Sequence, residues 1–217
     1  MDLTEALRTT GSAREFTDHV VDDATVTAIL DDARFAPSGG NRQPWRVAVV
    51  KDATIRRQLA DLMTSVWHEY LGQETDPTRA PFACGRSTGA PPVAAPNGLL
   101  DNIEQVPVVL AVAADLNKIA LMDGDIAGRP PITGGASIYP FGWSVLLAAR
   151  ARGLGGVMTT FLSRAETQAA PILGLPEGHA LVATIFLGQP VHQNTKLRRG
   201  QVSDFTTIDR FDGEPLR

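Results

Sequence analysis

The sequence contains a single cysteine, Cys84, in 217 residues. One thiol excludes an intrachain disulfide and any CxxC zinc site, and no histidine lies near it in sequence, so we expect it to be unreactive. The formal net charge of −4 argues against a nucleic-acid-binding surface, which needs clustered positive charge. No apolar run reaches the length of a membrane span, so we expect no membrane partner.

Several motifs of known chemistry are also missing. The segment 153–156 is glycine-rich but is not a dinucleotide fingerprint, because Met158 stands where the last glycine would be. P-loop, H-E-x-x-H and G-x-S-x-G patterns do not occur, and the histidines have no metal-ligand spacing. We therefore expect no metal and no catalytic side-chain nucleophile. A bound cofactor is then the expected carrier of any chemistry.

The composition is that of a globular protein, with 43% hydrophobic and 20% charged residues. The length predicts one domain spanning residues 1–217, with enough apolar residues for a sizeable core. The first five residues are acidic and lack the pattern of a signal peptide. The sequence therefore predicts a soluble, cytoplasmic protein.

Hydrophobic spacing predicts a mixture of helices and strands. A helix is expected after Asp22 and Asp23, with an apolar face that includes Phe35. The other expected helices span residues 2–8, 54–71 and 136–152, and the expected strands span 45–50, 107–113 and 181–187.

The helix expected over residues 136–152 has apolar residues on nearly every face, among them Phe141, Trp143 and Leu147. A helix that is apolar all round has to be buried on all sides. In a chain of this size, that pattern predicts a second subunit covering one face. Pro140 is compatible with the helix if it lies in the first turn, and Gly153 is expected to end it.

Residues 72–98 are rich in glycine, proline and alanine and have almost no periodic pattern. A loop of this length is either functional or disordered. Because Trp67, Tyr70 and Phe82 lie in or beside it, we predict a lid over a planar ligand. Beyond Pro190 the chain is polar and basic, and we predict a C-terminal arm over residues 190–217.

The most informative segment is the turn Ala36 to Trp45, with the sequence A-P-S-G-G-N-R-Q-P-W. It joins a helix to a strand through small residues and through amides that both donate and accept hydrogen bonds. Such a turn lets a flat polar ligand approach the backbone closely.

This turn resembles the signature loop of the flavin-dependent nitroreductase family, and three other segments support the resemblance. R-T-T-G-S-A-R-E-F, residues 8–16, is similar to the family's N-terminal motif, with Gly11 where a basic residue is usual. G-L-G-G-V-M-T-T, residues 153–160, resembles the strand that lies against the flavin. G-Q-P at 188–190 with K-L-R-R at 196–199 resembles the family's C-terminal phosphate-binding segment.

The resemblance implies a site in which the flavin carries the chemistry and no side chain is catalytic. It implies that Ser12 contacts the ribityl chain or phosphate, that Arg14 lies near the pyrimidine edge, and that Lys196 and Arg198 bind the phosphate. The cofactor-binding residues that it implies are Thr10, Gly11, Ser12, Arg14, Pro37, Ser38, Gly39, Asn41, Gln43, Met158, Thr159, Thr160, Lys196, Arg198 and Arg199.

The resemblance further implies an α+β fold with a mostly antiparallel sheet wrapped by helices. It implies a homodimer with two FMN sites, each drawing residues from both chains. NAD(P)H would supply hydride, and a nitroaromatic, quinone or similar small molecule would accept the electrons. Two alternatives stay open, namely other flavin chemistry (dehalogenation or flavin fragmentation) and flavin sequestration without turnover.

Overall fold

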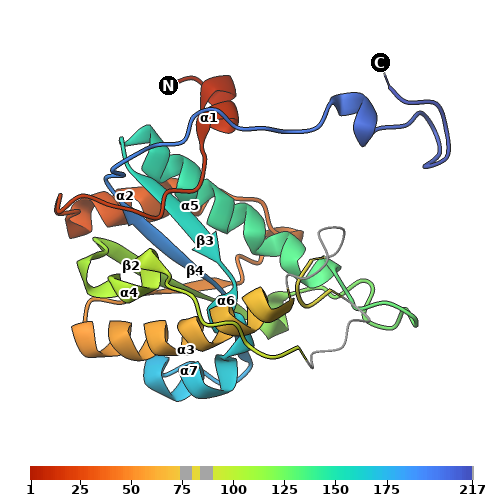
Figure 1. Ribbon diagram of the computed structural model, residues 1–217. Coiled ribbons are helices and arrows are strands. Elements are labelled where there is room, and N and C mark those ends of the chain that lie inside the picture. The colour runs from red at the N-terminus through yellow and green to blue at the C-terminus, as the bar shows by residue number, and fades with distance from the viewer. Residues whose placement is uncertain (74–79, 84–89, 217) are drawn as a thin grey trace.

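A four-stranded antiparallel sheet forms the centre of the molecule, and helices cover both of its faces (Figure 1). Figure 1 draws a computed structural model that describes residues 1–73, 80–83 and 90–216. The strand order is β1-β2-β4-β3, so β1 and β3 are the two edges. The strands are β1 (Trp45–Val49), β2 (Val108–Asp115), β3 (Gly155–Thr159) and β4 (His179–Gly188). The predicted α+β class with a mostly antiparallel sheet is confirmed.

The central strand β2 is buried on both sides because its residues are apolar without interruption. Val108 and Leu110 point into one hydrophobic core, and Val109 and Ala111 point into the other. A short continuous apolar run is the pattern expected of such a strand, which explains why it could be predicted from the sequence.

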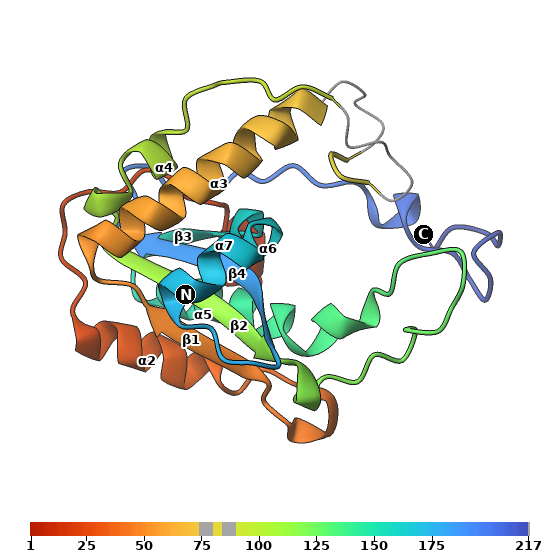
Figure 2. The same cartoon turned by 90° about the horizontal axis from the view of Figure 1, so that it is seen from below.

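Each core is closed by its own set of helices (Figure 2). Helices α2 (Asp23–Ala33) and α5 (Tyr139–Ala151) cover one face of the sheet, and α3 (Ala53–Gln73), α6 (Phe161–Arg164) and α7 (Glu166–Leu173) cover the other. The remaining α-helices are α1 (Leu3–Thr9) and α4 (Gly98–Asp101). Among the described residues, no helix has both the length and the apolar character needed to cross a membrane.

The predicted elements are present with small shifts in their ends. The expected cap of α2 is confirmed, because the Asp22 carboxylate accepts the Thr25 N–H at 2.8 Å. Placing Phe35 on the apolar face of this helix was wrong: α2 ends at Ala33, and Phe35 is 75% exposed. Its ring instead lies under the Arg34 guanidinium, 4.5 Å from the ring centroid.

Helix α5 buries only part of its apolar surface within one chain. Phe141 and Val145 are buried in the core, whereas Trp143 remains 36% exposed and Tyr139 42% exposed. Pro140 lies in the first turn, as expected, where its missing N–H breaks no helical hydrogen bond. The exposed aromatic residues are compatible with a covering subunit, which remains a prediction.

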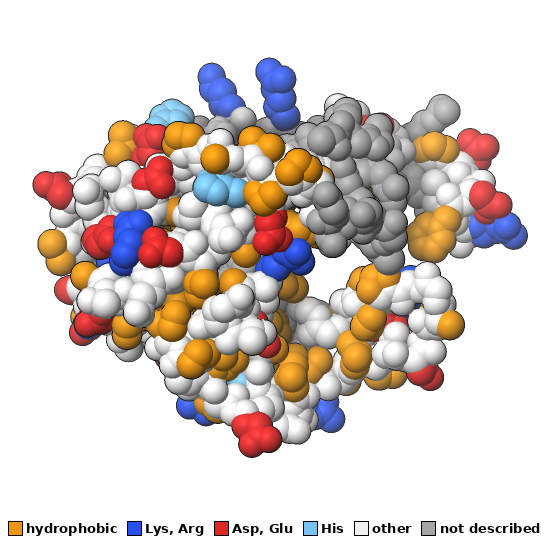
Figure 3. Space-filling view, turned by 60° about the horizontal axis from the view of Figure 1, so that its bottom comes forward, with side chains coloured by type: hydrophobic (Ala, Val, Ile, Leu, Met, Phe, Trp, Pro, Cys, Tyr) orange, Lys and Arg blue, Asp and Glu red, His pale blue; other side chains and the backbone are white. Residues whose placement is uncertain are grey.

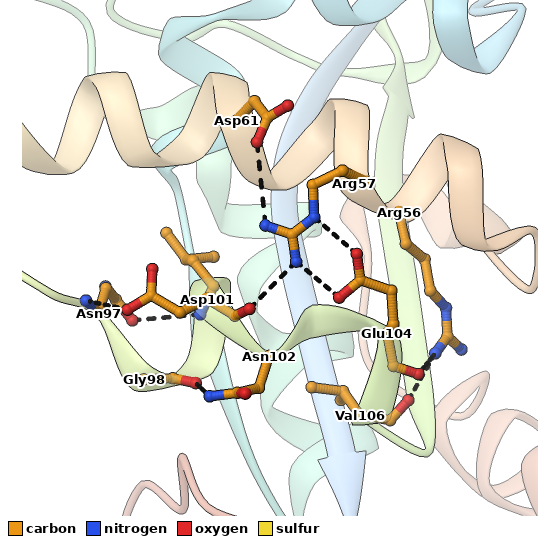
Figure 4. A network of polar contacts seen from close by, with 10 residues as sticks. Arg56, Arg57, Asp61, Asn97, Gly98, Asp101, Asn102, Glu104 and Val106 are labelled. Atoms are coloured by element: carbon orange, nitrogen blue, oxygen red, sulfur yellow. Dashed lines mark hydrogen bonds and ion pairs between the residues drawn. The ribbon is translucent and has the colours of Figure 1, made fainter.

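A polar network ties α3 to the segment that leads into β2 (Figure 4). Arg56 is only 8% exposed and donates to the backbone oxygens of Val50 at 2.8 Å and Val106 at 2.6 Å. Desolvation lowers the pKa of this guanidinium. Its neighbour Arg57 lies nearer the surface and pairs with Glu104 through two bonds of 2.6 Å.

The Arg57–Glu104 pair predicts a pH dependence of stability. Hydrogen bonds from Arg57 lower the pKa of Glu104 from 4.5 to about 2. A carboxylate with a lowered pKa stabilises the fold above its unfolded pKa, and this stabilisation is lost as the pH falls through the folded pKa. We therefore expect Glu104→Gln to lower the thermal unfolding midpoint at pH 7, and the difference from wild type to shrink between pH 4.5 and about 2. A difference that stays constant down to pH 2 contradicts this explanation.

Candidate functional site

The N-terminal segment lies against the edge strand β3 and brings two predicted regions together. The Ala13 N–H donates to the Gly156 carbonyl at 3.0 Å, and Ser12 pairs with Gly156 in a parallel bridge. Gly156 has no space for a side chain, because a Cβ there would lie 2.4 Å from the Phe186 carbonyl oxygen. Glycine at position 156 therefore permits the close packing of β3 on its neighbours, and on the side of the N-terminal segment a Cβ on Gly155 would lie 3.0 Å from the Ala13 Cβ.

A cavity of about 510 Å³ opens beside this contact. Arg14 and residues 158–160 line it, together with aromatic rings from α3 and α6. We call it the aromatic pocket. Its lining residues are Arg14, Trp67, Tyr70, Pro96, Asn97, Leu99, Leu100, Met158, Thr159, Thr160 and Phe161.

Two lining residues of the aromatic pocket carry buried polar atoms without a partner. Within the part of the chain that the structure describes, Thr159 Oγ1 and Trp67 Nε1 make no hydrogen bond. Such atoms are costly to leave unsatisfied. A polar, planar group at this pocket is therefore compatible with the residues present. Residues 1–73, 80–83 and 90–216 hold no group of three or more His, Cys, Asp or Glu side chains arranged to bind a metal.

The basic tail lies next to the N-terminal segment and explains the glycine at position 11. A Cβ on Gly11 would lie 2.6 Å from the Asn194 backbone oxygen and 2.9 Å from Leu197. The Gln193 side-chain amide also donates to the Gly11 carbonyl at 3.1 Å. The tail thus occupies the space that a basic side chain at position 11 would need. Thr10, beside it, uses its hydroxyl to donate to the Ala6 carbonyl at 2.7 Å.

Three cations of this tail are exposed to solvent, namely Lys196, Arg198 and Arg199. None of them forms an ion pair with a described acidic residue. Lys196 lies within the stretch 194–197 that contacts Gly11, and Arg198 and Arg199 follow it directly. The structure therefore places the basic tail beside residues 10–12, as an anion-binding role for it requires.

The turn at residues 37–43 forms a second group of candidate residues. Asn41 and Gln43 have φ values of 52° and 48°, a left-handed conformation that costs energy for residues other than glycine. Hydrogen bonds hold them there: Ser38 Oγ accepts the Gln43 N–H at 3.0 Å, and Gln43 Nε2 donates to Asn41 Oδ1 at 3.1 Å. Backbone strain of this kind is common where a turn presents side chains to a ligand.

The two groups lie at opposite edges of the sheet. Residues 158–160 belong to or follow β3, whereas the turn leads directly into β1. Three strand spacings separate these edges, which is about 14 Å. The turn is fixed instead near the start of α5, where Ser137 Oγ accepts the Gly39 N–H at 3.0 Å. One chain therefore brings Ser12 and Arg14 to residues 158–160 but does not bring Asn41 and Gln43 to the same pocket.

Sequence reasoning missed several pocket residues and one residue that supports the turn. Phe161, Leu99 and Leu100 line the pocket, and Ser137 supports the turn. Only Phe161 had a local signal, because it directly follows the matched segment 153–160. The others come from distant parts of the chain.

The predicted lid, residues 72–98, lies partly within the described residues. Residues 74–79 and 84–89, including Cys84, lie outside the described residues. Of the remainder, Pro96 and Asn97 line the aromatic pocket, and Phe82 lies behind Tyr70 with a ring-centroid distance of 6.3 Å.

Comparisons with known proteins identify the family. The model of the Nitroreductase family matches residues 7–189. A 5,6-dimethylbenzimidazole synthase from Rhodospirillum rubrum is 31% identical over 179 residues, which is 82% of this chain and 76% of that protein.

Solved structures have the same fold. The NADPH:FMN oxidoreductase from Vibrio harveyi, complexed with NAD+, superposes with a TM-score of 0.66 at 20% identity, covering 99% of this chain and 79% of that one. A nitroreductase with bound FMN from Desulfitobacterium hafniense gives 0.64 at 20% identity, covering 95% and 97%.

Proposed function

Because this chain belongs to the nitroreductase family, whose members are oxidoreductases, we propose that it uses FMN to pass electrons from NAD(P)H to a nitroaromatic, quinone or similar small acceptor. The observation that carries this proposal is the aromatic pocket. It combines one cation, Arg14, with the β3 end and with the rings of Trp67, Tyr70 and Phe161. A site for a flat cofactor and a flat substrate needs apolar walls and a few convergent polar groups.

The chain's own residues would hold the cofactor at three points. Arg14 provides a permanently charged cation toward the flavin ring, and this cation stabilises negative charge that develops on the ring. Residues 158–160 present the end of β3 to the pocket, and Lys196 and Arg198 supply charge for a phosphate. When bound, FMN supplies the hydride-accepting and electron-donating chemistry, so the protein's task is binding, orientation and electrostatics.

The distance between the two residue groups supports a site shared by two chains. Asn41 and Gln43 would complete the pocket of a partner subunit. Exposed apolar residues on the loop between β2 and α5 favour burial against a second copy, since Met122 is 79% and Ile132 73% exposed. Figure 3 shows hydrophobic side chains on the outer surface, including the part that protrudes at the lower right. The C-terminal arm extends away from the body (Figure 1) and exposes Phe205 and Phe211.

We expect the gently purified protein to be yellow and the apoprotein to bind one FMN per subunit. The reasons are Arg14 in the aromatic pocket and the basic tail that packs on Gly11, three residues before Arg14 in the chain. The measurements are the visible spectrum and a fluorescence titration of apoprotein with FMN. NAD(P)H added without oxygen should bleach the flavin, and menadione should restore it. A colourless protein that fails to quench added FMN contradicts the proposal.

A second candidate, flavin fragmentation, is favoured by the 31% identity to a 5,6-dimethylbenzimidazole synthase. The same preparation separates the candidates. Steady NAD(P)H oxidation with menadione, with the flavin spectrum intact afterwards, supports the oxidoreductase. Irreversible loss of the bound flavin spectrum in the presence of NAD(P)H and oxygen supports fragmentation. Bound flavin that undergoes neither change supports sequestration.

A further inference from the structure

Phe82 has a strained backbone. Its φ value is 57°, in the left-handed region. A bulky residue adopts this conformation only where its surroundings fix it, and such residues cluster at functional sites. The contacts that hold Phe82 in this conformation therefore indicate which part of the structure depends on it.

Both the backbone and the ring of Phe82 are held. Its N–H donates to Gln73 Oε1 at 2.8 Å, and Gln73, at the end of α3, is only 2% exposed. The Arg164 guanidinium lies over the Phe82 ring, 4.2 Å from the centroid. The centroid of the Tyr70 ring lies 6.3 Å from that of the Phe82 ring. Phe82 thus lies between a residue of α3 and a residue of α6.

Arg164 extends this contact into a clamp between α3 and α6, the two helices that carry aromatic rings of the pocket. It pairs with Glu69 at 2.9 Å, and Glu69 precedes the pocket residue Tyr70. Arg164 also ends α6, the helix that begins with the pocket residue Phe161. The Tyr70 and Phe161 ring centroids lie 6.0 Å apart. The two rings pack edge to face, so loosening the clamp would let this aromatic pair shift relative to the rest of the pocket lining.

Residues 93–97, which follow Phe82 in the chain, are fixed to the same part of α3. The Val93 N–H donates to the His68 carbonyl at 2.9 Å, and the His68 ring Nε2 lies 3.3 Å from the Ala95 carbonyl oxygen. These contacts hold Pro96 and Asn97 at the pocket. The end of α3 therefore supports two parts of the pocket lining, the aromatic rings and the segment with Pro96 and Asn97.

We propose that Phe82 and Arg164 are positioning residues that set the width of the aromatic pocket and thereby the size of the planar acceptor. They act through Tyr70 and Phe161 and do not themselves line the pocket. Releasing the clamp lets these rings shift, and this favours a fused-ring acceptor relative to a single-ring acceptor. This inference rests on the proposed function for the identity of the ligand.

The test uses two variants and a matched control. Arg164→Met keeps the length of the side chain but removes the ion pair and the ring contact, and Phe82→Leu removes the ring. The control is Arg34→Met, because Arg34 also pairs with a carboxylate, Asp31, at 2.6 Å and covers a phenylalanine ring at 4.5 Å. Arg34 lies just beyond α2, on the other face of the sheet.

We expect the ratio of kcat/KM for menadione to that for 1,4-benzoquinone to rise about three- to tenfold in Arg164→Met and Phe82→Leu, mainly through KM. Arg164→Lys keeps a charge opposite Glu69 and should restore most of the wild-type ratio. Arg34→Met should leave the ratio unchanged. If Arg164 had only a structural role, Arg164→Met would also leave the ratio unchanged. The Arg164 side chain is 42% exposed, so its variants should fold.

Calorimetric titration of each quinone into the oxidised protein gives the same ratio without turnover. A wild type that binds both quinones but reduces neither contradicts the proposed function, while the binding ratio still tests the clamp. The clamp is overturned if both variants keep the wild-type ratio, if the ratio falls, or if Arg34→Met changes it equally.

Discussion

Replacing Arg56 by leucine is expected to destabilise the fold by about 2–5 kcal/mol, because two buried carbonyl groups lose their donors. These are the carbonyls of Val50 and Val106, bonded at 2.8 and 2.6 Å. Val50 follows the end of β1, and Val106 precedes β2. The guanidinium therefore fixes where the chain leaves one strand and enters the next. Urea unfolding followed by circular dichroism measures the loss.

The neighbouring arginine provides the control. Arg57→Leu removes the pair with Glu104, in which the two side chains are 37% and 39% exposed. Pairs near the surface contribute about 1 kcal/mol or less. Equal losses in the two variants would mean that the buried carbonyl contacts of Arg56 add nothing beyond a surface ion pair.

Arg56 also illustrates what the sequence does not reveal. In the pattern of α3 it reads as one of two adjacent surface cations, and nothing local distinguishes it from Arg57. The difference arises because loop carbonyls from two other segments converge on one of them. By contrast, the apolar runs that became β2 and β4 were predictable, because a strand buried on both faces needs an uninterrupted run of apolar residues.

The same distinction applies to the site. Short motifs identified Ser12, Arg14 and residues 158–160, which the structure brings together at one edge of the sheet. The aromatic wall was only partly predictable, because it depends on how the end of α3 packs on α6. The short helices α6 and α7 had no clear periodic signal, and α7 contains Pro171. Packing against the sheet, and not helix propensity, stabilises such helices.

Single substitutions in the aromatic pocket and in the turn at residues 37–43 are both expected to weaken FMN binding. Arg14→Ala removes a cation from the aromatic pocket, and Asn41→Ala removes an amide from the strained turn. Hydrogen bonds that involve a charged group contribute about 1.5–3 kcal/mol, so we expect a loss of about one to two decades in affinity for Arg14→Ala, and of about one decade for Asn41→Ala. Fluorescence titration of each apoprotein measures this loss.

Mixing the two variants then tests whether one site draws on two chains. In a two-fold dimer with shared sites, a heterodimer of Arg14→Ala and Asn41→Ala has one site with both native residues and one site with neither. Random assembly makes half of the dimers heterodimers, so about one quarter of all sites should bind FMN with wild-type affinity. Sites built within one chain would give no recovery, because every chain carries one defect.

A double variant mixed with wild type provides the matched control. When Arg14→Ala and Asn41→Ala are on the same chain, each site of a shared-site heterodimer lacks one native residue, and only the wild-type homodimers keep intact sites. About one quarter of all sites should then bind tightly, whereas sites within one chain would give about one half. Since Arg14 lies by β3 and Asn41 lies before β1, at opposite edges of the sheet, we expect one quarter in both mixtures. Zero in the first and one half in the second would place the complete site within one chain, and Asn41 would then have to reach it by a rearrangement of the turn.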